Sequence, residues 1–167
     1  MRIRSFAAVA LLATAPLAVS VGAVAAPATV NVSIGPELQA KALKTYGERE
    51  VARLADELRA DAERALAKSG AYADSRVELV MTDVVPNRPT FKQLGDKPGL
   101  SFESFGVGGA AFTGRIIAAD GTETPLSYKW YESDIRQAYG NSTWRDAEWA
   151  IDRFTARLAR GQTLAQR

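Results

Sequence analysis

The sequence predicts an α+β domain, a two-layer sandwich in which a mostly antiparallel sheet of about four strands carries two amphipathic helices on one face. Three observations support this fold class. Several short segments alternate apolar and polar residues, as half-buried strands do. Two longer segments repeat apolar residues at steps of three and four, as amphipathic helices do. The pair Asp120-Gly121 separates two of the alternating segments, which is typical of a hairpin turn. Because each helix must bury its apolar stripe, one face of a sheet serves both.

The first half of the domain is expected to form a strand, a helix and a strand. Residues 28–34 alternate valine and isoleucine with polar residues, and residues 37–44 are compatible with a short helical turn. Thr45 and Glu48 have the spacing of a capping box, which predicts that the long helix begins there and ends near Ser69-Gly70. Residues 76–85 are rich in β-branched residues and predict the second strand. The apolar stripe of the helix comprises Val51, Leu54, Leu58, Ala62, Ala65 and Leu66.

The second half is expected to contain a long polar loop, a hairpin and a closing helix. The hairpin spans about 110–133, and Pro125 suggests that its second arm lies at a sheet edge. Residues 134–139 predict a short helical piece. Thr143 and Asp146 have capping spacing before the last helix, which stops at Gly161. Its apolar stripe comprises Trp144, Ala147, Ile151, Phe154 and Leu158.

Residues 1–25 have the three-part layout of a secretory signal. Arg2 and Arg4 precede a long apolar run, and Ala23-Val24-Ala25 forms a cleavage site before Ala26. An uncleaved N-terminal membrane anchor is the alternative, since the run is long enough to span a bilayer. We expect cleavage, a single domain over residues 26–167 with no further membrane span, and a periplasmic or secreted protein of a bacterium.

The composition excludes several classes of chemistry. The chain has no cysteine and no histidine, so it has no disulfide, no thiolate nucleophile, no Ser-His-Asp triad and no Cys or His metal site. Two of its 21 basic residues lie in the signal segment, so residues 26–167 carry 19 basic and 19 acidic residues. Because binding to nucleic acid needs a basic surplus or patch, we expect no nucleic-acid partner.

The glycine run at 106–109 fits the loose nucleotide-binding pattern G-x-G-x-x-G/A through Gly106, Gly108 and Ala111. A phosphate site of that kind needs a helix N-terminus after the glycines. Here the following residues, Ile116-Ile117 among them, predict a strand that leads into the hairpin. We therefore expect a bent or bulged strand entry, and we predict no cofactor and no metal.

Five carboxylates near the C-terminus raise the possibility of a small hydrolase, because a pair of carboxyl groups at suitable separation cleaves glycosidic bonds. We expect capping and surface ion pairs for all five, since their spacing matches no cation-binding loop. The residues are Glu132, Asp134, Asp146, Glu148 and Asp152.

Trp149 is the most informative residue of the last helix. At 100° per residue it points roughly opposite to the apolar stripe, with Arg145 and Arg153 one turn away on either side. An arginine stacks well on an indole, and both residue types are enriched at binding hot spots. We predict an exposed Arg-Trp-Arg surface for a partner; burial under another segment, or a lone indole without a role, are the alternatives.

The long loop after Val85 offers a second candidate patch, because long ordered loops are often functional. Its prominent side chains are Asn87, Arg88, Phe91 and Lys92. The alternative is a surface excursion that Phe91 and Leu94 fasten to the core.

Four segments resemble small exported bacterial proteins of unknown function with a β-α-β-β-β-α order. They are "YGERE" at 46–50, "VELVMTDV" at 77–84, the hairpin around Asp120-Gly121, and "YKWYESDI" at 128–135. The resemblance implies the fold and an exported location and brings no catalytic residues. We therefore expect a non-enzymatic binding or envelope-associated protein whose partner is an envelope protein or a small ligand, with a carboxylate-dependent hydrolase of the cell envelope as the alternative.

Overall fold

The computed structural model describes residues 26–162, so the predicted signal segment lies outside the described residues. Within this range no helix has the length and apolar composition needed to cross a bilayer. The elements, in chain order, are β1 (Thr29–Ile34), α1 (Pro36–Lys41), a π-helical turn (Ala42–Tyr46), α2 (Glu48–Ser69), β2 (Arg76–Val85), α3 (Phe91–Asp96), β3 (Gly109–Ile117), β4 (Glu123–Tyr131), a 3₁₀ turn (Ile135–Gln137) and α4 (Arg145–Ala159).

The four strands form one mixed sheet in the order β1-β2-β3-β4. β1 and β2 are parallel and are connected through α2, whereas β2, β3 and β4 pair antiparallel. This arrangement confirms the predicted α+β fold class with a mostly antiparallel sheet. β2 contains a bulge between Met81 and Asp83, so that Met81 and Val84 both face the core although they are three positions apart, an odd number.

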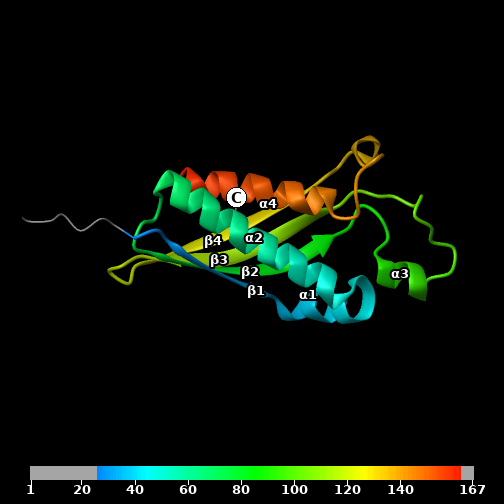
Figure 1. The fold of residues 1–167 in the computed structure, drawn as a ribbon, viewed down its shortest axis with the longest axis horizontal. Coiled ribbons are helices and arrows are strands. Elements are labelled where there is room, and N and C mark those ends of the chain that lie inside the picture. The colour runs from blue at the N-terminus through cyan, green and yellow to red at the C-terminus, as the bar shows by residue number, and fades with distance from the viewer. Residues whose placement is uncertain (1–25, 163–167) are drawn as a thin grey trace, which may run out of the picture.

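The two long helices lie side by side on one face of the sheet (Figure 1). The predicted apolar stripes are buried, apart from the partly exposed Ala65. At the centre, Phe154 of α4 packs 5.2 Å from Phe112 of β3 and 5.7 Å from Tyr128 of β4, measured between ring centroids. Burial of such side chains contributes about 1.5–3 kcal/mol each.

Both predicted capping boxes on the long helices are wrong. Thr45 lies inside the π-helical turn, and α2 begins after Gly47, whose φ of 97° favours glycine. α4 begins after Trp144, and the Asp146 side chain bonds elsewhere. A capping box does occur at α3, where the Thr90 hydroxyl accepts from the Gln93 N–H and the Gln93 side chain accepts from the Thr90 N–H. The sequence did not predict this helix.

Candidate functional site

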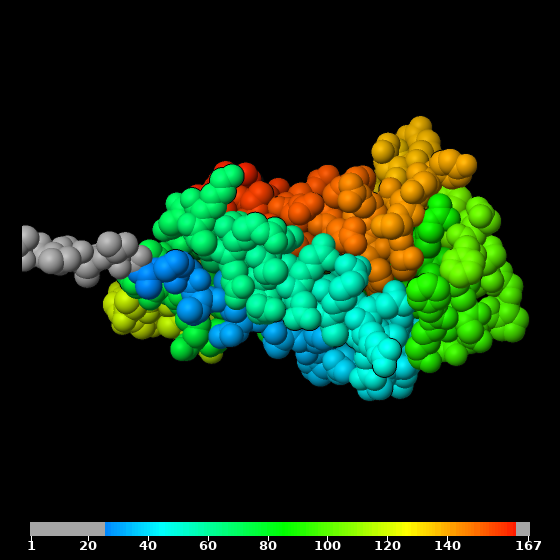
Figure 2. All heavy atoms as spheres, in the orientation of Figure 1, coloured from blue at the N-terminus to red at the C-terminus, as the bar shows by residue number. Residues whose placement is uncertain are grey.

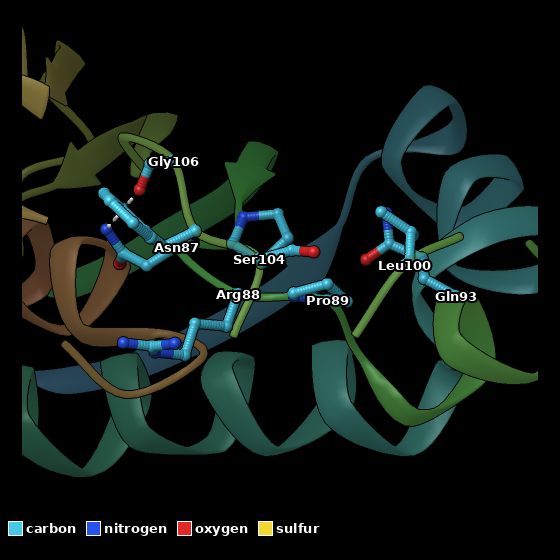
Figure 3. A pocket seen from close by; sticks show the side chains of 9 residues that line it. Asn87, Arg88, Pro89, Gln93, Leu100, Ser104 and Gly106 are labelled. Atoms are coloured by element: carbon cyan, nitrogen blue, oxygen red, sulfur yellow. Dashed lines mark hydrogen bonds between the residues drawn. The ribbon is translucent and has the colours of Figure 1, made fainter. Parts of the chain in front are cut away.

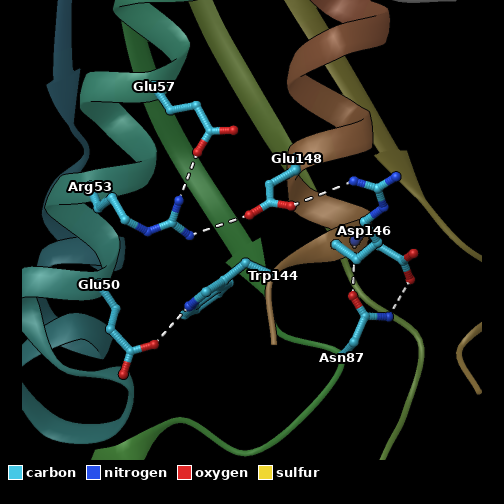
Figure 4. A network of polar contacts seen from close by, with 8 residues as sticks. Glu50, Arg53, Glu57, Asn87, Trp144, Asp146 and Glu148 are labelled. Atoms are coloured by element: carbon cyan, nitrogen blue, oxygen red, sulfur yellow. Dashed lines mark hydrogen bonds and ion pairs between the residues drawn. The ribbon is translucent and has the colours of Figure 1, made fainter. Parts of the chain in front are cut away.

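A buried polar network fastens the loop after β2 to the start of α4 (Figure 4). Asn87 is 1% exposed, and its side-chain amide donates to the Asp146 carboxylate at 2.6 Å. The Asp146 N–H donates in return to the Asn87 side-chain oxygen at 2.9 Å. The same carboxylate accepts from the Gly108 N–H at 2.8 Å and from the Asn141 side-chain amide at 3.2 Å. We call Asn87, Gly108, Asn141 and Asp146 the polar clamp, because they join three segments of the loop region to α4.

The polar clamp changes the roles assigned to two residues from the sequence. Asp146 was expected to cap a helix or form a surface ion pair, but its side chain is fully buried. It accepts hydrogen bonds from Gly108 and Asn87, which lie 38 and 59 positions earlier in the chain. Asn87 was placed in a partner-binding patch, whereas its side chain is enclosed in the clamp. Asn87 therefore positions the loop that carries its neighbour Arg88.

Arg88 connects three parts of the loop region. Its Nε donates to the Asn141 carbonyl at 2.6 Å, and one terminal nitrogen donates to the Phe102 carbonyl at 2.8 Å. Its guanidinium carbon also lies 6.0 Å from the centroid of the Phe105 ring. Both loops are thus held in place by one cation, because a guanidinium offers donors in a fixed planar arrangement.

Four exposed aromatic side chains, in two pairs, lie on the segments that Arg88 connects. Phe91 is 78% exposed, Phe102 66%, Phe105 44% and Tyr139 79%. Phe91 packs edge-on against Phe102 with ring centroids 6.3 Å apart, and Phe105 packs in the same way against Tyr139 at 5.9 Å. Figure 2 shows the two loops that carry them, residues 86–108 and 132–144, at the same end of the molecule. We call these four aromatic residues and Arg88 the aromatic end.

A cavity of about 200 Å³ lies beside Arg88 (Figure 3). Its lining combines apolar side chains with the polar groups of the loop, and includes Pro86, Arg88, Pro89, Leu100, Ser104 and Phe105. The aromatic end therefore has a concave part next to its projecting rings.

The structure brings Arg88 and Phe91 of the predicted loop patch to this end and gives Lys92 a local partner. The Lys92 ammonium forms an ion pair with Asp96 at 2.8 Å, one turn along α3. Phe91 points away from the core, so the idea that it fastens the loop is wrong. Sequence reasoning missed Phe102, Phe105 and Tyr139. The sequence did offer a signal: these aromatic residues lie in polar, glycine-containing segments that lack the apolar periodicity of a helix or strand. That pattern gives no reason to expect them in the core.

The second candidate surface lies along α4 and β4. The Arg145 guanidinium carbon lies 5.0 Å from the centroid of the Trp149 ring, as the sequence predicted. Arg153 instead lies 4.3 Å from the ring of Trp130 on β4, and Trp130 packs edge-on against Trp149 with centroids 6.5 Å apart. Trp149 is half-buried by this contact and not fully exposed.

The stacking continues along the same seam. Arg157 lies 5.4 Å from the ring of Tyr128. One helical turn of four residues advances about 6 Å, and two strand residues advance about 6.6 Å. Arg153 and Arg157 on α4 therefore match Trp130 and Tyr128 on β4. We call Arg145, Trp149, Trp130, Arg153, Tyr128 and Arg157 the arginine–aromatic ladder.

The glycine run leads into β3, as expected from the residues that follow it. Only glycine fits at positions 108 and 109, because neighbouring backbone lies too close for a side chain. A Cβ at Gly108 would lie 2.5 Å from the Val85 carbonyl oxygen, and a Cβ at Gly109 would lie 2.3 Å from the Trp130 carbonyl oxygen. The bulge that the sequence placed in this run lies in β2 instead. The run thus begins a strand and supplies a clamp donor through Gly108.

Four of the five C-terminal carboxylates interact within the chain. Glu148 pairs with Arg53 at 3.4 Å, and Asp134 caps the 3₁₀ turn and pairs with Arg136 at 2.7 Å. Glu132 accepts from two backbone N–H groups, and Asp146 belongs to the polar clamp. Asp152 is exposed. Among the described residues no cluster of three acidic side chains has the geometry for a metal ion.

A further polar group lies at the end of the sheet on the face away from α2 and α4. Asp83 accepts from the Lys41 ammonium and from the Tyr131 hydroxyl, both at 2.8 Å. Burial, together with the hydrogen bond to the Asp83 carboxylate, raises the pKa of Tyr131 well above its ordinary value. The phenol therefore stays protonated and acts as a donor that ties β4 to β2.

No family model matches the chain, and no curated protein matches it at a significant level.

Proposed function

We propose that this chain is a non-enzymatic, exported protein-binding module of the bacterial cell envelope, and that the aromatic end is its contact surface. The observation that carries the proposal is the presence of two pairs of exposed aromatic side chains on the segments that Arg88 connects. Clustered exposed apolar groups mark interaction sites more often than single ones do. Aromatic residues and arginine are also the types enriched at the centres of protein interfaces.

The rigidity of the two loops supports the same function. Arg88 holds both loops through backbone carbonyls, and the polar clamp fixes the base of the first loop. Ordering a flexible loop on binding costs about 0.5–1.5 kcal/mol for each immobilised side chain. A surface that is already ordered avoids much of this cost, which favours a binding role for the exposed rings.

The charges around the rings nearly balance. Residues 86–108 contain three basic side chains, Arg88, Lys92 and Lys97, and two acidic ones, Asp96 and Glu103, and Lys92 forms an ion pair with Asp96. Attraction to an anionic lipid surface takes a cluster of about four to eight basic residues. The loop has no such cluster, which favours a protein partner over a lipid surface.

Photo-crosslinking in the producing cells tests the proposal. A benzophenone amino acid at Phe102 should give a discrete crosslinked protein, and the same probe at the exposed Ala52 of α2 should not. Adding Phe91→Ser and Phe105→Ser should abolish the crosslink without unfolding the chain, because the side chains are 78% and 44% exposed and neither belongs to the buried core.

Two results would contradict the proposal. One is the absence of any discrete product at Phe102, Phe105 and Tyr139 when the protein is present at its normal level. The other is binding to vesicles of anionic phospholipid that depends on the same phenylalanines, which would assign the aromatic end to a membrane surface.

A further inference from the structure

The outer edge of β4 is free along its length in the part of the chain that the structure describes. β4 is the last strand of the sheet, and its only partner there is β3. An edge strand presents unpaired N–H and C=O groups that accept a further strand. Pro125 protects only the first half of this edge, because it has no N–H to offer.

The hydrogen bonds at both ends of the β3–β4 pair show which groups face the free edge. The Ala118 N–H donates to the Thr122 carbonyl at 3.0 Å, and the Glu132 N–H donates to the Gly108 carbonyl at 2.9 Å. Bonded and non-bonded pairs alternate in an antiparallel sheet, so the even-numbered residues of β4 bond to β3. The N–H and C=O groups of Ser127, Lys129 and Tyr131 therefore point to the free edge.

The side chains beside this edge carry unbalanced positive charge. Tyr128 and Trp130 point toward the helix layer, and the guanidinium groups of Arg157 and Arg153 lie over their rings. Both arginines are exposed, and neither forms an ion pair with any residue of 26–162. A guanidinium stacked by its face on a ring keeps its N–H edge available for a carboxylate.

We propose that the second half of β4 accepts an extended acidic segment of a partner protein as a fifth strand. The added strand would bond to the backbone of Ser127, Lys129 and Tyr131. Every second side chain of that strand would lie beside Tyr128 or Trp130, about 6.6 Å apart. The arginines above those rings are one helical turn apart, so carboxylates at alternate positions of the strand match Arg153 and Arg157.

The charge of the ladder distinguishes this occupant from a second copy of the chain. Antiparallel pairing of two β4 edges would place both helix layers on the same side and bring Arg153 and Arg157 of the two copies together. Like charges at that distance oppose association. The inference does not depend on the aromatic end, which lies on other residues.

Fluorescence polarisation with labelled synthetic peptides tests the inference on the full-length protein. The peptide Glu-Thr-Glu-Thr-Glu-Thr-Glu-Thr should bind, because its carboxylates alternate. A peptide of the same composition with paired glutamates, Glu-Glu-Thr-Thr-Glu-Glu-Thr-Thr, and an alternating peptide with N-methylated backbone should each bind at least tenfold more weakly.

Two protein variants separate the charge from the strand pairing. Arg153→Gln with Arg157→Gln should weaken binding of the alternating peptide about tenfold or more. Its matched control, Arg49→Gln with Arg64→Gln, removes two exposed arginines from α2 and should leave binding unchanged. Lys129→Pro removes one N–H that points to the free edge, and β4 already has a proline at an equivalent position four residues away. This variant should weaken binding by a similar factor, whereas Lys129→Gln, which removes only the charge, should have little effect.

Several outcomes would overturn the inference. One is failure of the alternating peptide to bind, or equal binding of all three peptides. Another is that the arginine variant weakens peptide binding while Lys129→Pro and N-methylation of the peptide do not. The arginine–aromatic ladder would then bind polyanions without strand pairing. A dimer in sedimentation that Lys129→Pro dissociates would assign the edge to a second copy. Loss of peptide binding on Phe91→Ser with Phe105→Ser would place the peptide on the aromatic end.

Discussion

Replacing Asp146 by alanine should destabilise the fold strongly, because the carboxylate is the shared acceptor of the polar clamp. The change removes two short hydrogen bonds, from Asn87 at 2.6 Å and from Gly108 at 2.8 Å, and a longer one from Asn141. A hydrogen bond to a charged group contributes about 1.5–3 kcal/mol. Asn87 keeps its bond to the Gly106 carbonyl, which limits the loss. The buried Gly108 N–H has no other acceptor among residues 26–162.

The expected loss in the free energy of unfolding for Asp146→Ala is therefore about 3–5 kcal/mol. For a domain of this size that lowers the Tm by about 10–15 °C. Asp146→Asn should cost less, about 1–2 kcal/mol, because its amide oxygen still accepts from Asn87 and Gly108 while only the side facing Asn141 changes.

Urea denaturation followed by circular dichroism measures both values, with Asp152→Ala as the matched control. Asp152 is exposed on the same helix, and its removal should change stability by about 0.5 kcal/mol or less. If Asp146→Ala lowered the free energy of unfolding by less than about 1 kcal/mol, the polar clamp would not be what holds the loop to α4, and the order of the loop would come from other contacts.

Three further predictions concern other parts of the chain. Gly109→Ala should cost more than about 2 kcal/mol, since its Cβ would lie 2.3 Å from the Trp130 carbonyl, while Gly106→Ala, with open space around it, should be nearly neutral; thermal denaturation compares them. The raised pKa of Tyr131 means that the unfolded chain loses that proton first, so stability should fall as the pH rises above about 10, and Tyr131→Phe should reduce this fall in urea titrations at high pH. Protein recovered from outside the cytoplasm should begin at Ala26, whose N–H donates to the Asp74 carboxylate at 2.7 Å; N-terminal sequencing that finds residues 1–25 retained would favour the membrane anchor.

The sequence predicted those features that depend on local periodicity. The stripe from Val51 to Leu66 and the alternation in β2 are properties of a single element, so the helices, the strands and their buried faces follow from spacing alone. The hairpin follows from Asp120-Gly121 in the same way, because the turn conformation depends on the residues within it.

The features that the sequence did not predict depend on contacts between distant segments. Asp146 has the right spacing from Thr143 for a cap, but Asn87 and Gly108 offer the carboxylate stronger partners that only the tertiary fold brings near. Arg153 was expected to stack on Trp149 within its own helix, and it stacks on Trp130 because β4 lies beside α4. The spacing of residues along one helix or strand indicates which of its own side chains can meet. It does not show which side chains of a neighbouring helix or strand pack against them.

Both proposed surfaces are positioned by α4, yet by different parts of it. Its first turn contributes Asp146 to the polar clamp and so controls the loops of the aromatic end. Arg153 and Arg157, two and three turns further along, are held by stacking on β4 and touch no member of the clamp. A change confined to the first turn should therefore separate the two functions. Asp146→Asn, which leaves the chain folded and disturbs the contact with Asn141, should reduce crosslinking at Tyr139 in the same loop while the alternating acidic peptide still binds at β4. Equal loss of both activities would mean that α4 shifts as one body and that the two surfaces are coupled.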